Sequence, residues 1–173
     1  MLSSFATVLH ERRANMTICY HCQLQERLPF DFAPDLWEEF WNANCYEYLL
    51  NFRNSSETQL KVGSVINRKF QPYQSDLELI TILKYELSEI GFSMENSNNS
   101  DIVPDNKMKF FVSRSRCGDY HFYRLDSNGK WSHKFGFEKP TNLNFMGQEI
   151  ILPELACSTD RSVGYFLLGI NKE

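Results

Sequence analysis

Hydrophobic residues follow two different periods along this chain, and the change falls near residue 107. In the segment "SDLELITILKYELSEI", residues 75–90, apolar side chains recur every three or four positions, which predicts a helix. Ser75 and Glu78 have the spacing of a capping box, and Gly91 supplies a residue suited to a helix end. We therefore expect a well-defined helix over 75–90.

An earlier segment, "DLWEEFWNANCYEYLLNF" at 35–52, also has helical spacing. Its apolar positions are Leu36, Trp37, Phe40, Trp41, Tyr48, Leu49 and Phe52. Asn42 or Asn44 can interrupt this pattern and cap a second helix that starts near Cys45. Trp37 and Trp41, four residues apart, are expected to pack on one face. Residues 53–74 are polar and irregular, with a short possible strand at 60–66.

After residue 107 the pattern becomes typical of strands. We expect strands over 108–115, 119–126, 130–136, near 141–151 and over 162–170. The Asn- and Ser-rich stretch before them, 93–107, is predicted to be a mobile loop. Because helices precede strands, the pattern predicts an α+β fold with N-terminal helices packed on a C-terminal antiparallel sheet.

Length and charge narrow the class of protein. A chain of 173 residues suits one domain, 1–173, with 1–33 as a lead-in segment. The net charge of −4 argues against nucleic-acid binding, which needs a basic face. No apolar run approaches the ~20 residues of a membrane span, and the first residues lack the basic region of a Sec signal. We expect a cytoplasmic protein, or one secreted by a signal-peptide-independent route; the oligomeric state stays open.

The cysteines favour free thiols over disulfides or a metal. There are five, Cys19, Cys22, Cys45, Cys117 and Cys157, and an odd number argues for a reducing compartment. "CYHC" at 19–22 places His21 between two cysteines, and Cys117 and Cys157 could complete a set of four. Their spacing, however, is not that of a zinc finger or ribbon. We expect neither a metal nor an organic cofactor.

The segment "DYHFYRLDSNGKWSHKFG", residues 119–136, reads as a hairpin. "SNG" at 127–129 predicts a type I turn with Gly129 in the left-handed region as a bulge. Asp126 then pairs with Lys130, and Tyr123 with His133. Strand alternation places two histidines, His121 and His133, on one face, in diagonal positions ~7–8 Å apart at the backbone. The same face carries Tyr123, Leu125, Trp131 and Phe135.

Cys45 and the histidines together suggest nucleophilic chemistry. A helix N-terminus and a nearby imidazole both lower a thiol pKa, so Cys45 is expected to be a reactive thiolate with His121 as its base. A third group must orient the imidazole; His133 is suitably placed, and Asn142 or Asn144 are alternatives. The ordinary alternatives are a small buried cysteine and histidines that merely fill the core.

The order of these residues along the chain is that of papain-like thiol enzymes. "NCYEYLLN" (44–51) and "DYHFYRLDSNGKWSHKFG…TNLN" (119–144) resemble a bacterial papain-like family with the patterns NCYxYALN and HxYRxDxxGxWSHKxGxxxxTNLD. They are also similar to NlpC-like cell-wall peptidases, in which a second histidine often orients the first. The resemblance covers 42–52 and 108–170. It departs from the pattern at Asn144, where an aspartate is expected, and in "LPELACSTDRSVGYF" (152–166).

The resemblance implies a papain-like fold and a Cys–His–His triad that acts on an amide bond of a peptide or protein substrate. Cys45 would form a thioester, His121 would transfer the proton and His133 would hold His121. The oxyanion hole would contain the Cys45 backbone N–H and a side chain from Asn42 or Asn44. Hydrolysis, deamidation and transamidation all remain open. The alternative is a non-catalytic binding or adaptor protein on the same fold, with a translocated bacterial effector as one form of it.

Overall fold

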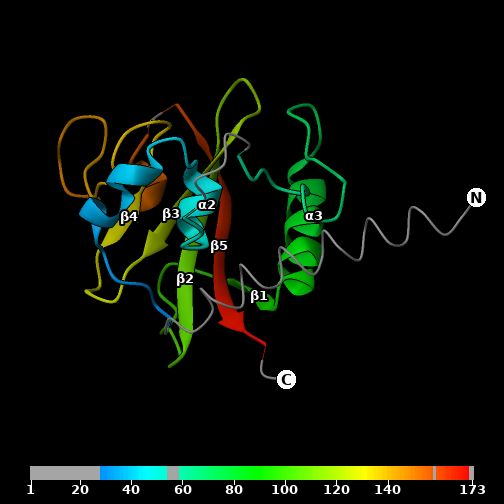
Figure 1. Ribbon diagram of the computed structural model, residues 1–173, viewed down its shortest axis with the longest axis horizontal. Helices are drawn as coiled ribbons and strands as arrows, with labels where there is room; N and C mark the ends of the chain where they lie inside the picture. The colour runs from blue at the N-terminus through cyan, green and yellow to red at the C-terminus, as the bar shows by residue number, and fades with distance from the viewer. Residues whose placement is uncertain (1–27, 54–58, 158, 172–173) are drawn as a thin grey trace, which may run out of the picture.

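The computed structural model describes residues 28–53, 59–157 and 159–171 (Figure 1). Two 3-10 helices, two α-helices and five strands follow one another within these ranges. In order they are η1 (Pro34–Phe40), α2 (Cys45–Leu49), α3 (Asp76–Glu89), β1 (Phe92–Ser97), β2 (Lys107–Arg114), β3 (Tyr120–Leu125), β4 (Trp131–His133), η2 (Pro153–Leu155) and β5 (Arg161–Ile170).

The five strands form one open antiparallel sheet in the order β1-β5-β2-β3-β4. The last strand, β5, lies between β1 and β2 and pairs with both, so β1 is joined to the rest of the sheet through β5. The α+β class and the order of helices before most strands are confirmed.

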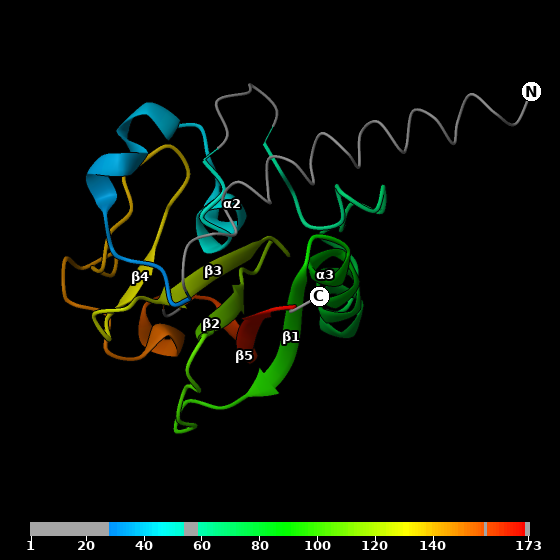
Figure 2. The same ribbon diagram turned by 60° about the horizontal axis from the view of Figure 1, so that its bottom comes forward.

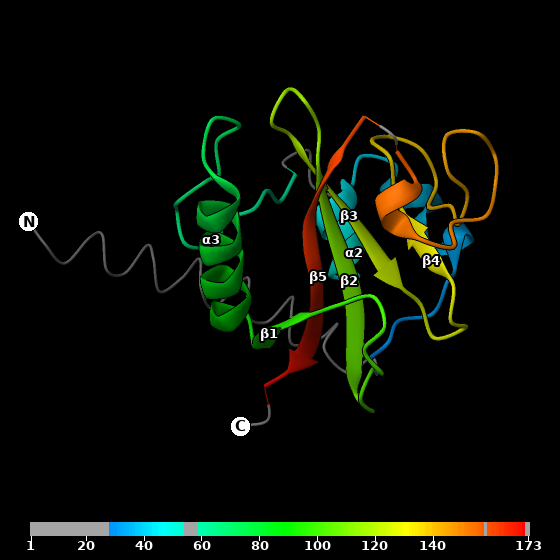
Figure 3. The ribbon, with the colours of Figure 1, turned by 180° about the vertical axis from the view of Figure 1, so that it is seen from behind.

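The sheet has two differently covered faces. Helices α2 and α3 pack on one face, over a core that contains Phe110, Phe122 and Phe166 (Figure 2). On the opposite face, Phe111, Tyr123 and Trp131 lie under the segment that contains η2, which is seen in front of the sheet in Figure 3. Successive strand residues alternate between these two layers, as the pleat requires.

Two local predictions are confirmed in detail. Helix α3 begins after Ser75, whose side chain accepts the backbone N–H of Glu78 while the Glu78 carboxylate accepts that of Ser75. It ends at Gly91, whose φ of 89° lies in the left-handed region. In the hairpin, Asp126 donates its N–H to the Lys130 carbonyl and Gly129 has a φ of 76°, as a type I turn with a bulge requires.

The expected strand at 60–66 is wrong. This segment forms turns, because the N–H groups of Gly63 and Val65 donate to the buried carboxylate of Glu86 on α3. Gly63 has a φ of 83°, and a Cβ atom there would lie 1.9 Å from the carbonyl oxygen of Arg68. The turn therefore requires glycine at this position, whereas the sequence pattern shows only apolar alternation.

The expected loop at 93–107 is wrong for its first five residues, which belong to β1. Phe92 and Met94 face the core, and β1 pairs with β5 from Phe92↔Ile170 to Ser97↔Tyr165. The strand is at the edge of the sheet, so its remaining side chains are polar and hide the strand pattern. In the loop that follows, the Lys109 ammonium donates to the carbonyls of three residues, Asn98, Asn99 and Asp101.

The expected strand near 141–151 is also wrong. Only isolated bridges form there, between His133 and Thr141 and between Leu143 and Glu149. The Asn144 side chain accepts the backbone N–H groups of Met146 and Gln148, which bends the chain into a turn. Side-chain capping of this kind competes with a strand ladder.

The aromatic segment before α2 is a 3-10 helix, and its two tryptophans do not share a face. Trp37 is buried and packs on Tyr48, with ring centroids 5.0 Å apart. Trp41 is exposed and contacts Phe137. With three residues per turn, positions four apart diverge, so the expectation based on an α-helix is wrong.

The hairpin β3–β4 is joined to the segments before it by a buried arginine. Arg124 forms an ion pair with Asp126 at 2.7 Å, and neither side chain is exposed. It donates to the carbonyls of Tyr48 and Asp31, and its guanidinium lies 3.9 Å from the centre of the Tyr48 ring. One cation therefore joins the hairpin to the C-terminal part of α2 and to the segment before η1.

Replacing this cation should strongly destabilise the fold. We expect Arg124→Met to lower the free energy of unfolding by roughly 3–5 kcal/mol, because it leaves Asp126 as an uncompensated buried charge. Lys130→Ala is the matched control: it breaks an exposed ion pair with Glu149 in the same hairpin and should cost about 1 kcal/mol or less. Urea denaturation followed by circular dichroism measures both. Equal effects would contradict the role of Arg124.

Candidate active site

Cys45 is the first residue of α2, and the capping predicted for Asn44 is confirmed. The Asn44 side-chain oxygen accepts the N–H groups of Tyr46 and Glu47, and the Glu47 carboxylate accepts the N–H of Asn44. The Asn44 amide donates to the carbonyl of Leu60 at 2.7 Å. These bonds fix the start of the helix, and with it the Cys45 backbone.

A buried lysine that the sequence analysis did not single out holds the chain before Cys45. The Lys134 ammonium donates to the carbonyls of Trp41, Ala43 and Gly136 at 2.6–3.0 Å, and the side chain is fully buried. Burial lowers the pKa of Lys134 to about 8, against the charge of Glu47, which raises it. Strand alternation could have flagged Lys134, since it shares its face with Arg124.

The Cys45 sulfur lies against the backbone of β3. Its hydrogen bond goes to the Tyr120 carbonyl, at 3.9 Å, and the Phe122 N–H also interacts with the thiol. Arg124 of β3 pairs with Ser132 of β4, so continuing the same register would pair Phe122 with Lys134. Strand β4 ends at His133, however, so the edge of β3 at Phe122 has no partner strand on this side. The thiol therefore occupies the edge of β3 that β4 leaves open, beside the backbone of Tyr120 and Phe122.

The thiol is not a thiolate in this structure. Burial raises the pKa of Cys45 to about 12, which the Phe122 N–H opposes and the charge of Asp119 reinforces. The expected low pKa is therefore wrong here. Loss of water around the sulfur raises the pKa of Cys45 more than the N-terminus of α2 lowers it, because the helix has only five residues and packs on the sheet.

The two histidines form a direct hydrogen bond, as their shared face predicted. Nε2 of His121 lies 2.7 Å from Nδ1 of His133, and Nε2 of His133 lies 3.0 Å from the Leu143 carbonyl. A carbonyl can only accept, so Nε2 of His133 carries a proton and its Nδ1 is bare in the neutral ring. His121 must then donate from Nε2, which leaves Nδ1 of His121 with a free lone pair.

Both rings are held in their neutral forms. Burial lowers the pKa of His121 to about 3, with the charge of His133 acting in the same direction. Burial also lowers the pKa of His133, although the Leu143 carbonyl and the charge of Glu138 oppose the shift. The Tyr123 ring stacks on His133 at 5.0 Å and meets His121 edge-on at 4.8 Å, which fixes both rings.

The structure brings Cys45 to the backbone of Tyr120 and Phe122, on either side of His121, but does not join the cysteine and histidine side chains. His121 lies on the sheet face of Tyr123, whereas Cys45 packs beside Tyr120 on the helix-covered face. Within the part of the chain that the structure describes, no hydrogen bond links the Cys45 sulfur to a histidine. Contact between them requires the thiol to leave the Tyr120 carbonyl.

The other candidate residues are engaged elsewhere. The Asn144 side chain holds the turn at 146–148, and the backbone carbonyl of Asn142 accepts the N–H of Ile150. Of the three candidates for the third group, His133 is the one that the structure bonds to His121. The Asn44 side chain serves the helix cap, and the Asn42 carbonyl accepts the side chain of Gln59. The Cys45 N–H lies in the first turn of α2, where backbone N–H groups have no partner within the helix.

The two other thiols that the structure describes, Cys117 and Cys157, have no hydrogen bond to this site. Cys117 is exposed, and a hydrogen bond from Ser115 lowers its pKa; Cys157 is partly buried. Cys19, His21 and Cys22 fall outside the described residues. Among residues 28–53, 59–157 and 159–171, no group of three or more His, Cys, Asp or Glu side chains could hold a metal. No helix in those ranges is long and apolar enough to cross a membrane.

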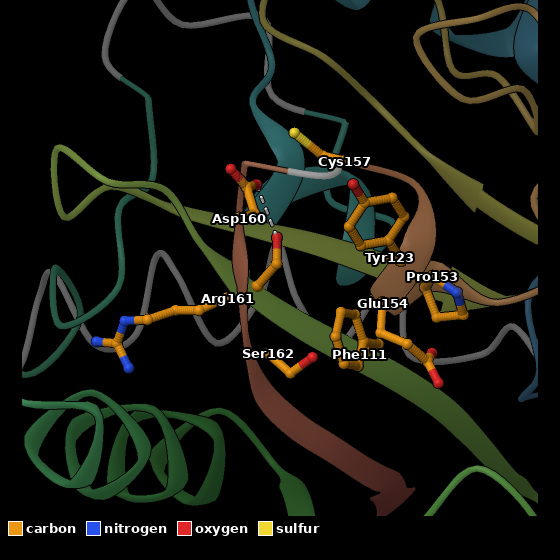
Figure 4. Close-up of a pocket in the computed structure, with 9 residues that line it drawn as sticks. Phe111, Tyr123, Pro153, Glu154, Cys157, Asp160, Arg161 and Ser162 are labelled. Carbon is orange, nitrogen blue, oxygen red and sulfur yellow. Dashed lines mark hydrogen bonds between the residues drawn. The ribbon is translucent and has the colours of Figure 1, made fainter.

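Two hollows in the surface do not include the candidate triad. One lies between β2, β5 and η2 and is lined by Tyr123, Glu154, Cys157 and Asp160 among others (Figure 4), but it has no room for a water molecule. The other, about 530 Å³, lies between Pro72–Ser75, the β2–β3 turn and Arg161. Neither is lined by Cys45, His121 or His133.

Comparison with known proteins gives one short likeness. No family model and no solved structure matches the chain. It is 55% identical over 38 residues to Insoluble matrix shell protein 1 from Ruditapes philippinarum. The match covers 22% of this chain and 26% of that protein, so the chain spans about a quarter of its length. A likeness of this extent does not define a family.

The depressed pKa of His121 should make stability fall in acid. The folded pKa, about 3, lies below the unfolded value of 6.5, so the unfolded chain binds the proton first and folding weakens as pH drops. Relative to His121→Gln, the wild type should lose roughly 1 kcal/mol per pH unit between about pH 6 and pH 4. Urea denaturation of both proteins at several pH values in this range measures the difference. If the free energies of unfolding of the wild type and of His121→Gln depend on pH in the same way, His121 is not a buried neutral imidazole.

The hydrogen-bond chain also fixes the tautomers. Long-range ¹⁵N–¹H correlation spectra at about pH 7 should show both histidines protonated on Nε2 and bare on Nδ1, because the Leu143 carbonyl accepts from His133. His133→Asn should leave the His121 signal assignable as a control. Protonation of His121 on Nδ1 would contradict this arrangement.

Proposed function

We propose that the protein is a cysteine-dependent amide hydrolase or acyl transferase in which Cys45, His121 and His133 act together. The observation that carries this proposal is the hydrogen-bond chain from the Leu143 carbonyl through His133 to His121. It leaves Nδ1 of His121 unprotonated, and the two residues on either side of His121, Tyr120 and Phe122, supply the backbone groups that contact the Cys45 thiol. A papain-like fold is part of the proposal, supported by a cysteine helix that packs on the histidine strands.

The resting thiol and imidazole are both neutral, so the proposed mechanism is general-base catalysis without a preformed ion pair. The Cys45 sulfur turns from the Tyr120 carbonyl to the substrate, and Nδ1 of His121 accepts its proton as the S–C bond forms. The leaving amine takes this proton when the C–N bond breaks. A water molecule, or an amine in the transferase, then attacks the thioester and gives a proton to His121. The C–S bond breaks, and the Cys45 sulfur takes this proton back.

His133 and the start of α2 complete the proposed machinery. The Nδ1 of His133 holds the Nε2 proton of His121, so the imidazolium that forms is stabilised and correctly oriented. The Cys45 N–H stabilises the developing oxyanion, because the first turn of a helix leaves its N–H groups without partners in the helix. The substrate is proposed to be a peptide or protein, and no cofactor takes part.

A second candidate function is a non-catalytic binding or adaptor protein. The observation that favours it is the raised pKa of Cys45, which makes a resting thiolate unavailable. In that case the histidine pair serves only to anchor the Leu143 segment to the sheet.

Alkylation of the cysteines by iodoacetamide separates these two functions without a known substrate. If His121 is the base for Cys45, His121→Gln should slow alkylation of Cys45 about tenfold or more, since general-base catalysis contributes at least this much. Cys117 is the internal control: it is exposed, with a lowered pKa, so its rate should be high and unchanged in the variant. Peptide mapping by mass spectrometry gives both rates.

His133 provides the graded test. His133→Asn should slow Cys45 alkylation less than His133→Ala does, because an amide oxygen can still accept the His121 proton. A thermal melt of each variant checks that it is folded. A Cys45 rate that is independent of His121 and His133 in folded variants would support the adaptor function and overturn the catalytic one.

A further inference from the structure

Aromatic rings gather in the open beside the candidate histidines. Phe135, Phe137, Phe145 and Trp41 are exposed by 48%, 66%, 58% and 59%. All four lie in the loops that follow β4 or just before α2. Large exposed apolar patches on a folded domain mark binding sites more often than chance packing.

Two of these rings are continuous with the proposed triad. Phe135 lies 5.7 Å from the His121 ring and 5.1 Å from Phe145, which in turn lies 6.4 Å from His133, all between ring centroids. The four rings form a closed circuit in which His133 is buried, His121 is partly buried and the phenylalanines face solvent. A group resting on Phe135 and Phe145 is therefore next to the proposed base.

The rim of this surface is acidic. Trp41 contacts Phe137, which brings η1 beside the 135–139 loop (Figure 1). Asp35, Glu38 and Glu39 come from η1 and Glu138 from the loop, all of them exposed or partly exposed. The basic group facing them is Lys139, 3.2 Å from Glu38 and 4.0 Å from Asp35. The charge of Glu138 also acts on His133, where it opposes the lowering of the pKa by burial.

We propose that Phe135 and Phe145 form a subsite that accepts an aromatic or large aliphatic side chain of a basic peptide, beside the amide that Cys45 would attack. This inference rests on the proposed function and names its substrate class. Ring-on-ring contacts provide the apolar recognition, and the carboxylates of η1 and Glu138 attract lysine or arginine residues that flank the apolar one. An acidic peptide is disfavoured by the same rim.

Three blocked hexapeptides test the subsite by isothermal titration. The probes are acetyl-KKFGKK-amide, acetyl-KKSGKK-amide and acetyl-EEFGEE-amide, titrated at low salt into the full chain carrying Cys45→Ala. We expect the first to bind about tenfold or more tighter than the other two, because each of these lacks either the ring or the positive charges. Adding Phe145→Ala should remove this tenfold preference for the aromatic peptide.

Ile102→Ala is the matched control, since Ile102 is 91% exposed on the loop between β1 and β2 and should leave all three affinities unchanged. Equal binding of the three probes would overturn the proposal. A second result would also overturn it: the chain sediments as a dimer, Phe145→Ala makes it a monomer, and no peptide binds. The aromatic patch would then be a contact between two copies of the chain. The titrations use a chain without the Cys45 thiol, so they test the subsite alone. The His121-dependent alkylation tests the proposed function, and either result can be negative independently of the other.

Discussion

The arrangement of the candidate site depends on two buried cations that attach a five-residue helix to a hairpin. A helix as short as α2 is not stable alone, since nucleation costs more than so few hydrogen bonds return. Arg124 donates to the Tyr48 carbonyl near its C-terminal end, and Lys134 donates to the Ala43 carbonyl just before its start. Arg124 lies on β3, and Lys134 directly follows β4. The position of Cys45 is therefore a property of the hairpin as much as of its own helix.

These cations are costly to bury and are satisfied in different ways. Arg124 has a carboxylate partner in Asp126 and the face of the Tyr48 ring, so its charge is compensated. Lys134 has carbonyl partners, and burial lowers its pKa to about 8, because carbonyl dipoles compensate a buried charge less completely than an anion does. Glu47 adds to this network by bonding Asn44 and Leu60, which joins the 59–60 segment to the helix start.

The same low-polarity surroundings determine the chemical state of the site. Burial disfavours a thiolate on Cys45 and an imidazolium on His121, so both shifts favour the uncharged pair. A neutral imidazole with a fixed tautomer is a competent base, whereas a buried neutral thiol is unreactive until a base accepts its proton. For this reason the proposed mechanism transfers the proton during attack. In the same proposal, a substrate bound on the exposed rings beside His121 changes the environment of the thiol.

Local signals in the sequence determined much of this structure. Some signals act over only a few residues and could therefore be predicted: the capping box at Ser75 and Glu78, the Asn44 cap and the 127–129 turn. The turn also determined the register that pairs Tyr123 with His133. Tertiary contacts decided the rest. Strand β1 exists because β5, some 70 residues later, pairs with it, and the 62–67 turn exists because Glu86 accepts its N–H groups. The protonation state of Cys45 was likewise decided by burial, which a helix start in the sequence does not reveal, since the solvent around an atom depends on every segment that packs against it.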